Sequence, residues 1–127
     1  MKRSLVLVMA SVLLLYLLAS CGGGVNTYTD ANERINMGVD QEFIIALDSN
    51  PTTGYNWEES YDDTMLKLVE SKYELGKQAE EGLVGAGGTQ YFRFQALKTG
   101  KTDITLTYKR SWETESADQK VFSVDIE

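Results

Sequence analysis

Short segments in which apolar and polar residues alternate, separated by turn residues, cover most of the chain beyond residue 32. A period of two is typical of β-strands that bury one face. It is clearest in residues 89–97, where Phe92, Phe94 and Ala96 alternate with more polar neighbours. The predicted strands are residues 33–37, 42–47, 55–61, 65–74, 89–97, 102–109 and 120–126.

These seven strands follow one another without the strand–helix alternation of α/β proteins. Such a profile favours an all-β fold, an immunoglobulin-like antiparallel β-sandwich of about seven strands. For residues 65–74 a short helix is the alternative, because Leu66, Leu68 and Val69 do not define one register. Trp57 is expected in the core, since an aromatic residue in mid-strand usually packs inward.

The first twenty residues have the pattern of a secretory signal peptide. Lys2 and Arg3 precede an apolar run over residues 5–18, which is short for a membrane span. The run ends in Leu18-Ala19-Ser20-Cys21, which resembles the lipobox of prokaryotic lipoproteins. That resemblance implies cleavage before Cys21 and a lipid on its sulfur. The alternative is an ordinary signal peptide followed by a free thiol.

This N-terminus predicts an exported protein that its lipid anchors to the cell envelope, on the periplasmic or cell-surface face. Residues 21–32 begin with three glycines after Cys21 and are expected to form a flexible tether, with strand pairing by part of it left open. Residues 33–127 would form one domain. A single cysteine permits no internal disulfide, so packing of the core must stabilise the fold.

The charge of the chain limits its partners. It has 12 basic and 19 acidic residues, and removal of Lys2 and Arg3 leaves 10 basic against 19 acidic residues. A chain so acidic is not expected to bind nucleic acid, or anionic lipid through charge. The acyl chains on Cys21 would therefore hold it to the membrane. We expect a monomer.

Most catalytic chemistry is unavailable to this chain. It has no histidine, and its one cysteine is expected to carry lipid, so the Ser-His-Asp and Cys-His arrangements are excluded. We predict no metal site and no cofactor. Carboxylate pairs such as Glu58 with Glu59 or Glu80 with Glu81 leave a carboxylate enzyme as an alternative, although runs of acidic residues are usually only solvated.

Three connections have unusual compositions. The proline loop, residues 50–54, holds the only proline of the chain, and Gly54 supplies a backbone that can adopt positive φ. The glycine loop, residues 76–88, ends in four small residues, which make strand or helix unfavourable there. The tryptophan loop, residues 110–119, is polar and carries Trp112. In a seven-stranded immunoglobulin topology these three connections lie at one end of the sandwich.

The three connections together indicate a binding edge, since tryptophan and arginine are frequent anchors of protein interfaces. The simpler interpretations are a tight turn with polar filler for the proline loop and a tryptophan folded back onto the sandwich for the tryptophan loop. The candidate binding residues are Asn50, Pro51, Thr52, Thr53, Gly54, Tyr55, Gly85, Ala86, Gly87, Gly88, Arg110 and Trp112.

In their order along the chain, these motifs resemble the three loop motifs of chagasin-family inhibitors of papain-like cysteine peptidases. The resemblance covers the chain from about residue 33 onward. It implies that the partner is a papain-like cysteine peptidase and that Thr52 faces the catalytic cysteine and histidine of that peptidase. The residues Gly85 to Gly88 would pair through their backbone with the non-primed side of the peptidase cleft. Arg110 and Trp112 would pack on its primed side. Ser111 stands where the family pattern Arg-Pro-Trp has proline.

The resemblance therefore implies a reversible, tight-binding inhibitor that occludes the active-site cleft, and not an enzyme. The alternative from another class is a lipid-anchored immunoglobulin-like surface module that binds an envelope protein or a glycan.

Overall fold

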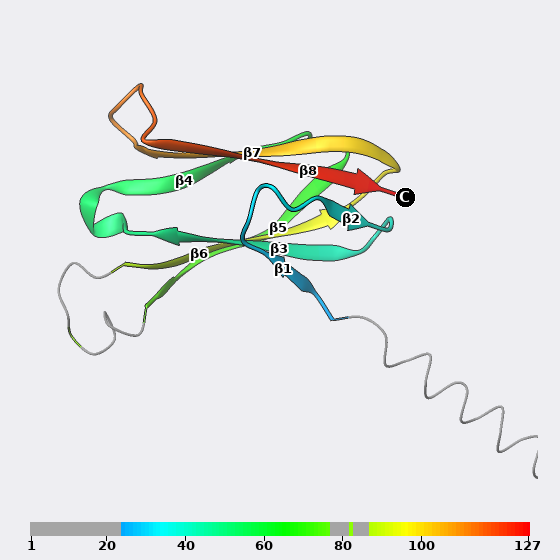
Figure 1. Ribbon diagram of the computed structural model, residues 1–127, viewed down its shortest axis with the longest axis horizontal. Helices are drawn as coiled ribbons and strands as arrows, with labels where there is room; N and C mark the ends of the chain where they lie inside the picture. Colours follow the sequence, from blue (N-terminus) through cyan, green and yellow to red (C-terminus); the bar gives the residue numbers. More distant parts are fainter. Residues whose placement is uncertain (1–23, 77–81, 83–86) are drawn as a thin grey trace, which may run out of the picture.

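The computed structural model describes residues 24–76, 82 and 87–127, and within them the chain forms two packed β-sheets (Figure 1). One sheet has the strand order β1-β3-β6-β5 and the other β2-β8-β7-β4. The strands are β1 (Asn26–Tyr28), β2 (Ile35–Met37), β3 (Glu42–Ser49), β4 (Tyr55–Ser60), β5 (Leu66–Leu75), β6 (Gly88–Ala96), β7 (Gly100–Arg110) and β8 (Asp118–Ile126). The predicted immunoglobulin-like β-sandwich is confirmed.

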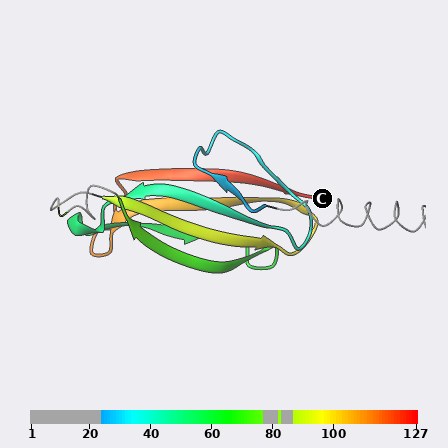
Figure 2. The same ribbon diagram turned by 90° about the horizontal axis from the view of Figure 1, so that it is seen from below.

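The N-terminal part of the described chain contributes a strand to each sheet. β1 pairs in parallel with β3, and after a crossover β2 pairs in parallel with β8. Figure 2 shows this crossover passing over one side of the sandwich. Strand pairing, left open for part of the predicted tether, therefore occurs at Asn26–Tyr28. The predicted signal peptide and Cys21 lie outside the described residues.

The core lies between the two sheets and consists of the apolar positions that the alternation predicts. Phe92, Phe94 and Ala96 of β6 have no exposed surface, and the alternating apolar residues of β3, β7 and β8 pack against them. Trp57 is only 5% exposed, so its predicted place in the core is confirmed. Full burial of a phenylalanine or leucine side chain stabilises such a fold by about 1.5–3 kcal/mol.

The segment 65–74, for which a helix was the alternative, is a strand with an irregularity. The pairing of β5 with β6 shifts register between Leu68 and Glu70, which leaves Val69 as an extra residue that is 43% exposed. Leu68 packs against the core on the other face. This β-bulge explains why the apolar residues of the segment follow no single period.

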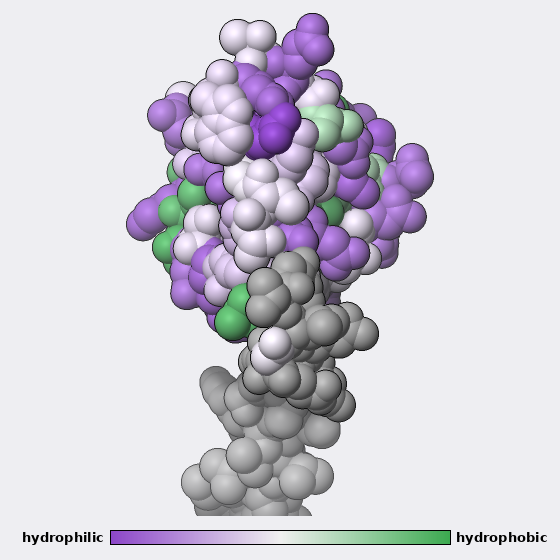
Figure 3. Space-filling model, turned by 90° about the vertical axis from the view of Figure 1, so that its left-hand side faces the viewer, coloured by the Kyte–Doolittle hydropathy of each residue, from purple (hydrophilic) through white to green (hydrophobic). Residues whose placement is uncertain are grey.

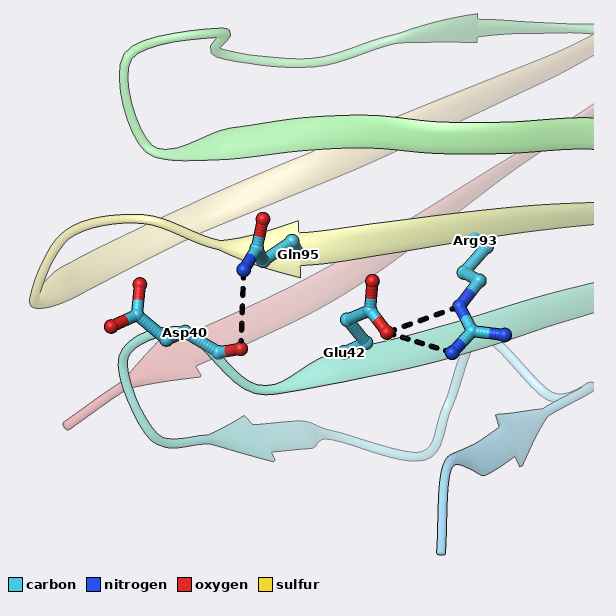
Figure 4. A network of polar contacts seen from close by, with 4 residues as sticks. All are labelled: Asp40, Glu42, Arg93 and Gln95. Carbon is cyan, nitrogen blue, oxygen red and sulfur yellow. Dashed lines mark hydrogen bonds and ion pairs between the residues drawn. The ribbon is translucent and has the colours of Figure 1, made fainter.

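The turns at one end of the sandwich, such as those at Gly38–Gln41 and Asp62–Met65, are short and local. In the β2–β3 turn Asp40 has a φ of 70°, and the Asp40 carbonyl accepts a hydrogen bond from the Gln95 side chain. Beside it the Arg93 guanidinium donates two hydrogen bonds to Glu42, at 3.2 and 2.7 Å (Figure 4). In the β4–β5 turn, the Asp62 carboxylate accepts hydrogen bonds from the hydroxyl and the backbone N–H of Thr64.

At the other end lie the β3–β4 and β7–β8 connections and the facing ends of β5 and β6 (Figure 1). Most of the predicted strands are too short at this end. Gly88 is the first residue of β6, where it pairs with Ser49 and Leu75. Because glycine has no side chain, the backbones of the two neighbouring strands can approach it closely. Strands β7 and β8 also extend further than predicted, so the irregular part of the tryptophan loop covers only residues 111–117.

The described part of the chain contains no helix with the length and hydropathy that a membrane span requires. It also contains no group of three or more acidic, histidine or cysteine side chains that could hold a metal ion.

Candidate functional site

The proline loop is a compact turn that its own residues hold in shape. Pro51–Thr53 forms one turn of 3-10 helix between β3 and β4, with Asn50 before it at φ −131° and ψ 83°. The backbone N–H groups of Thr53 and Gly54 donate to the carbonyls of Asn50 and Pro51. The hydroxyls of Thr52 and Thr53 donate to the side chain and the carbonyl of Asn50. The predicted turn is confirmed, with both threonines exposed at its tip.

Gly54 ends this turn and joins it to the tryptophan loop. Its φ of 85° lies in the left-handed region, as predicted, and a Cβ placed on it would lie 2.5 Å from Cη2 of Trp112. The indole of Trp112 therefore lies directly on the Gly54 backbone, and only glycine permits this contact. Two segments 58 positions apart in the sequence form one surface here.

Three aromatic residues, Tyr55, Trp57 and Tyr108, lie between the proline loop and the core and support the loop. The Asn50 N–H donates to the Tyr108 hydroxyl at 3.1 Å. The Tyr108 ring stacks on Trp57, with 4.8 Å between ring centroids, and lies 5.2 Å from the Tyr55 ring. The Trp57 indole N–H in turn donates to the Asp48 carbonyl. The loop is thus connected directly to the core of the sandwich.

Side-chain contacts shape the tryptophan loop together with two backbone hydrogen bonds, from the Glu113 N–H to the Arg110 carbonyl and from the Ala117 N–H to the Tyr108 carbonyl. The Arg110 guanidinium lies 4.8 Å from the Tyr55 ring centre and 5.5 Å from the Trp112 ring centre, and it forms an ion pair with Glu113. The hydrogen bond to Glu113 raises the pKa of Arg110. Trp112 remains 68% exposed although its ring touches Gly54. It is therefore not buried against the sandwich, which was the simpler interpretation.

Of the glycine loop, the structure describes residues 76, 82, 87 and 88, so Gly85 and Ala86 lie outside the described residues. Gly87 lies against the proline loop, where an added Cβ would be 2.8 Å from the Ser49 carbonyl oxygen and 3.3 Å from Cβ of Asn50. Gly88 is similarly close to the backbone of Glu74. Both glycines are therefore required by the close approach of neighbouring strands.

Residues of the proline loop and of the base of the glycine loop line a shared hollow of about 540 Å³. Its lining residues are Asp48, Ser49, Asn50, Gly76, Gly87, Gly88, Thr89 and Tyr108. Figure 3 looks onto this end of the molecule, where polar and weakly polar residues predominate and apolar residues are scattered. This end of the molecule presents no broad apolar patch among the described residues in this view.

Three residues of the site were not among the predicted ones. Tyr108 anchors the proline loop, Glu113 holds Arg110, and Gln90 exchanges two hydrogen bonds with the Trp57 backbone across the two sheets. The spacing of Arg110 and Glu113, three residues apart, was a signal for their contact in a turn. Tyr108 and Gln90 carried no such signal, because their contacts depend on how the two sheets pack.

The predicted site residues of the described chain do meet at one edge. Asn50 to Tyr55, Arg110 and Trp112 are linked by the contacts above, and Gly87 and Gly88 adjoin them. The sequence has no histidine, and the hydroxyls of both tip threonines donate within the loop. The proline and tryptophan loops thus form one projecting edge.

Comparisons with known proteins agree with this architecture. A family model described as chagasin family peptidase inhibitor matches residues 36–126. Chagasin of Trypanosoma cruzi is 35% identical over 96 residues, which cover 71% of this chain and 84% of that protein. Amoebiasin-1 of Entamoeba histolytica is 28% identical over 100 residues, 79% of this chain and 94% of that protein.

Among solved structures, the cysteine protease inhibitor EhICP2 of Entamoeba histolytica superimposes with a TM-score of 0.69 at 26% identity. The match covers 84% of this chain and all of that one. The family match spans most of the chain and includes the proline and tryptophan loops. This chain belongs to the chagasin family of peptidase inhibitors.

Proposed function

We propose that this protein is a reversible, tight-binding inhibitor of papain-like cysteine peptidases that occludes the active-site cleft with its three loops. The observation that carries the proposal is the contact between Gly54 and Trp112, which joins two of the family motifs into one rigid edge. Family membership supplies the class of target, since related members are named as cysteine protease inhibitors.

The proline loop is suited to entering a cleft without being cleaved. Its tip is narrow, because Thr52 and Thr53 carry small side chains. The hydrogen bond from the Gly54 N–H to the Pro51 carbonyl, at 2.9 Å, holds the tip in a closed turn. A peptide that is recognised as an added β-strand must be extended, and this closed turn is not extended. Binding would therefore exclude substrate without formation of an acyl-enzyme.

The neighbouring surfaces would contact the peptidase on either side of the inserted loop. On one side lies the base of the glycine loop, where Gly76, Gly87 and Gly88 line the hollow. On the other side Trp112 presents a large exposed ring held on Gly54. Loops that are ordered before binding lose little conformational entropy, which favours tight association.

Inhibition assays test the proposal directly. Purified residues 22–127 are titrated into papain and into a cathepsin L-type peptidase, with hydrolysis of a small peptide as the readout. We expect inhibition at stoichiometric concentrations and recovery of uncleaved inhibitor after dissociation. Absence of inhibition of several such enzymes would refute the proposal and favour the surface module that binds an envelope protein or a glycan.

A variant at the tip separates insertion from general binding. Thr52→Arg places a bulky charge on an exposed position, so inhibition should weaken by about 100-fold or more while the fold persists. Thr99→Arg makes the same change at an exposed position of the β6–β7 turn and serves as the matched control. Equal potency of the wild type and Thr52→Arg would contradict insertion of the proline loop.

We also propose that the protein is exported and anchored to the cell envelope through a lipid on Cys21. The motif Leu18-Ala19-Ser20-Cys21, after a basic start and an apolar run, supports this proposal. Mass spectrometry of the N-terminal peptide should show a diacylglyceryl adduct that is absent from a Cys21→Ala variant. An unmodified Cys21 in the exported protein would exclude the anchor.

A further inference from the structure

The tryptophan loop begins with a four-residue turn whose second position is suited to proline. The N–H of Glu113 donates to the carbonyl of Arg110 at 3.1 Å, which makes residues 110–113 a β-turn. Ser111 occupies the position after the first residue, where proline is favoured because its fixed φ matches the turn. Serine leaves this backbone freer, so another feature must restrict the loop.

That feature is the enclosure of the Arg110 side chain. Its guanidinium lies over the Tyr55 and Trp112 rings, and its terminal nitrogen pairs with the Glu113 carboxylate. The Arg110 and Glu113 side chains are only 34% and 33% exposed. The Arg110 Nε is buried and has no hydrogen-bond partner among the described residues. The Arg110 guanidinium thus makes its contacts within the protein, with Tyr55, Trp112 and Glu113, while the Trp112 ring is 68% exposed.

We propose that Glu113 is a positioning residue, whose ion pair with Arg110 orders Trp112 for binding and performs the rigidifying role that proline at position 111 would otherwise have. This inference rests on the proposed inhibitory function. It assigns Arg110 mainly to support of the loop and Trp112 to contact with the peptidase. Glu113 itself need not touch the peptidase.

Combining two substitutions tests the inference. Glu113→Ala removes the ion pair, and Ser111→Pro restricts the same turn by an independent route. If Glu113 acts by ordering the loop, Glu113→Ala should weaken inhibition by about 10-fold through faster dissociation, since one released side chain accounts for roughly that factor. The same substitution in the Ser111→Pro background should have a much smaller effect. Glu115→Ala changes an exposed acid of the same loop and is the matched control.

A measurement without peptidase separates this inference from the proposed function. The chain has two tryptophans, so ¹⁵N relaxation of their indole groups reports on Trp112, with the buried Trp57 as internal reference. Glu113→Ala should increase the motion of the Trp112 indole only, and adding Ser111→Pro should restore its order. A protein that inhibits no peptidase but shows this pattern would keep the ordering role and lose the proposed function.

Two results would overturn the inference. One is an unchanged Trp112 order parameter in Glu113→Ala. The other is an equal loss of inhibition by Glu113→Ala with and without Ser111→Pro, because it would mean that Glu113 contacts the peptidase directly.

Discussion

The proline loop and the tryptophan loop lie against each other, but different interactions hold them. Backbone hydrogen bonds, a proline and the threonine hydroxyls shape the proline loop from within. The tryptophan loop relies on the Arg110 side chain, which reaches Tyr55 on β4, the Trp112 ring and the Glu113 carboxylate. The proline loop therefore relies mainly on bonds within its own sequence, and the tryptophan loop relies mainly on contacts between side chains.

This difference predicts how each loop responds to substitution. A loop built from local backbone geometry depends less on residues outside it, provided that its glycine and proline remain. A loop held by side chains loses order when any one of the contributing groups is removed. The tryptophan loop should accordingly be the more adjustable part of the proposed binding edge, and the proline loop the less adjustable part.

Replacement of the exposed anchor should have the largest effect on inhibition. Trp112→Ala removes a ring that is 68% exposed, so we expect inhibition to weaken by about 30- to 1000-fold with little change in thermal stability. The measurement is the inhibition constant for papain together with a melting curve. Trp57→Phe is the contrasting variant, because Trp57 is buried and donates to the Asp48 carbonyl. It should lower stability more than Trp112→Ala does, and the reverse ranking would contradict the assignment.

Gly54→Ala tests the contact between the two loops. Alanine at a φ of 85° is strained, and its Cβ would displace the Trp112 ring. We expect the free energy of unfolding to fall by about 1–2 kcal/mol, with inhibition weakened by roughly 10- to 100-fold. Gly38→Ala is the control at the opposite end, where a Cβ would meet only the flexible Gln41 side chain. Unchanged inhibition by Gly54→Ala would separate the two loops functionally.

Tyr108→Phe tests whether the proline loop needs support from below. The substitution removes the oxygen that accepts the Asn50 N–H but keeps the ring stacked on Trp57. Loss of one partly buried hydrogen bond should cost about 0.5–1.5 kcal/mol of stability. Denaturant unfolding and the inhibition constant would show the change. Unaltered values in both measurements would mean that the loop is held by its internal bonds alone.

The turn at Asp62 supplies the smallest expected effect and a comparison outside the binding edge. Hydrogen bonds from the Thr64 hydroxyl and N–H lower the pKa of Asp62 below its ordinary value of 3.8. A carboxylate whose pKa is lowered in the folded state stabilises the fold at pH values above its pKa in the unfolded state. This contribution is lost as the pH falls through the pKa of the folded state. Asp62→Ala should slightly reduce the melting temperature at neutral pH, and the difference should vanish in strong acid.

Asp63→Ala is the control for this turn, since Asp63 is an adjacent exposed carboxylate. Inhibition of papain should be unaffected by either substitution. A loss of inhibition with Asp62→Ala would show that the opposite end of the sandwich contributes to binding.

The sequence predicted the sandwich because its determinants are local and periodic. Alternation in residues 89–97 defined a strand with one buried face, and Asn50, Pro51 and Gly54 specified a turn. The bulge at Val69 and the strand Asn26–Tyr28 were not specified in this way. Both depend on pairing with strands far away in the sequence, and β1 is only three residues long.

The candidate site divides in the same manner. Its loop motifs were visible in the sequence. The expected topology also predicted that these loops lie at the same end of the sandwich. The contact of Trp112 with Gly54 and the hydrogen bond from Asn50 to Tyr108 were not, because each joins residues 58 positions apart. Long-range packing determines those distances, and no local pattern encodes them.

Protection of the catalytic cysteine of papain tests the central claim most directly. With the wild-type protein bound at equimolar concentration, alkylation of that cysteine by iodoacetamide should become very slow, because the proline loop would cover it. With Thr52→Arg the rate should return toward that of free papain, and with Thr99→Arg it should stay slow. Alkylation at the free rate while the wild-type protein is bound would contradict occlusion of the active site.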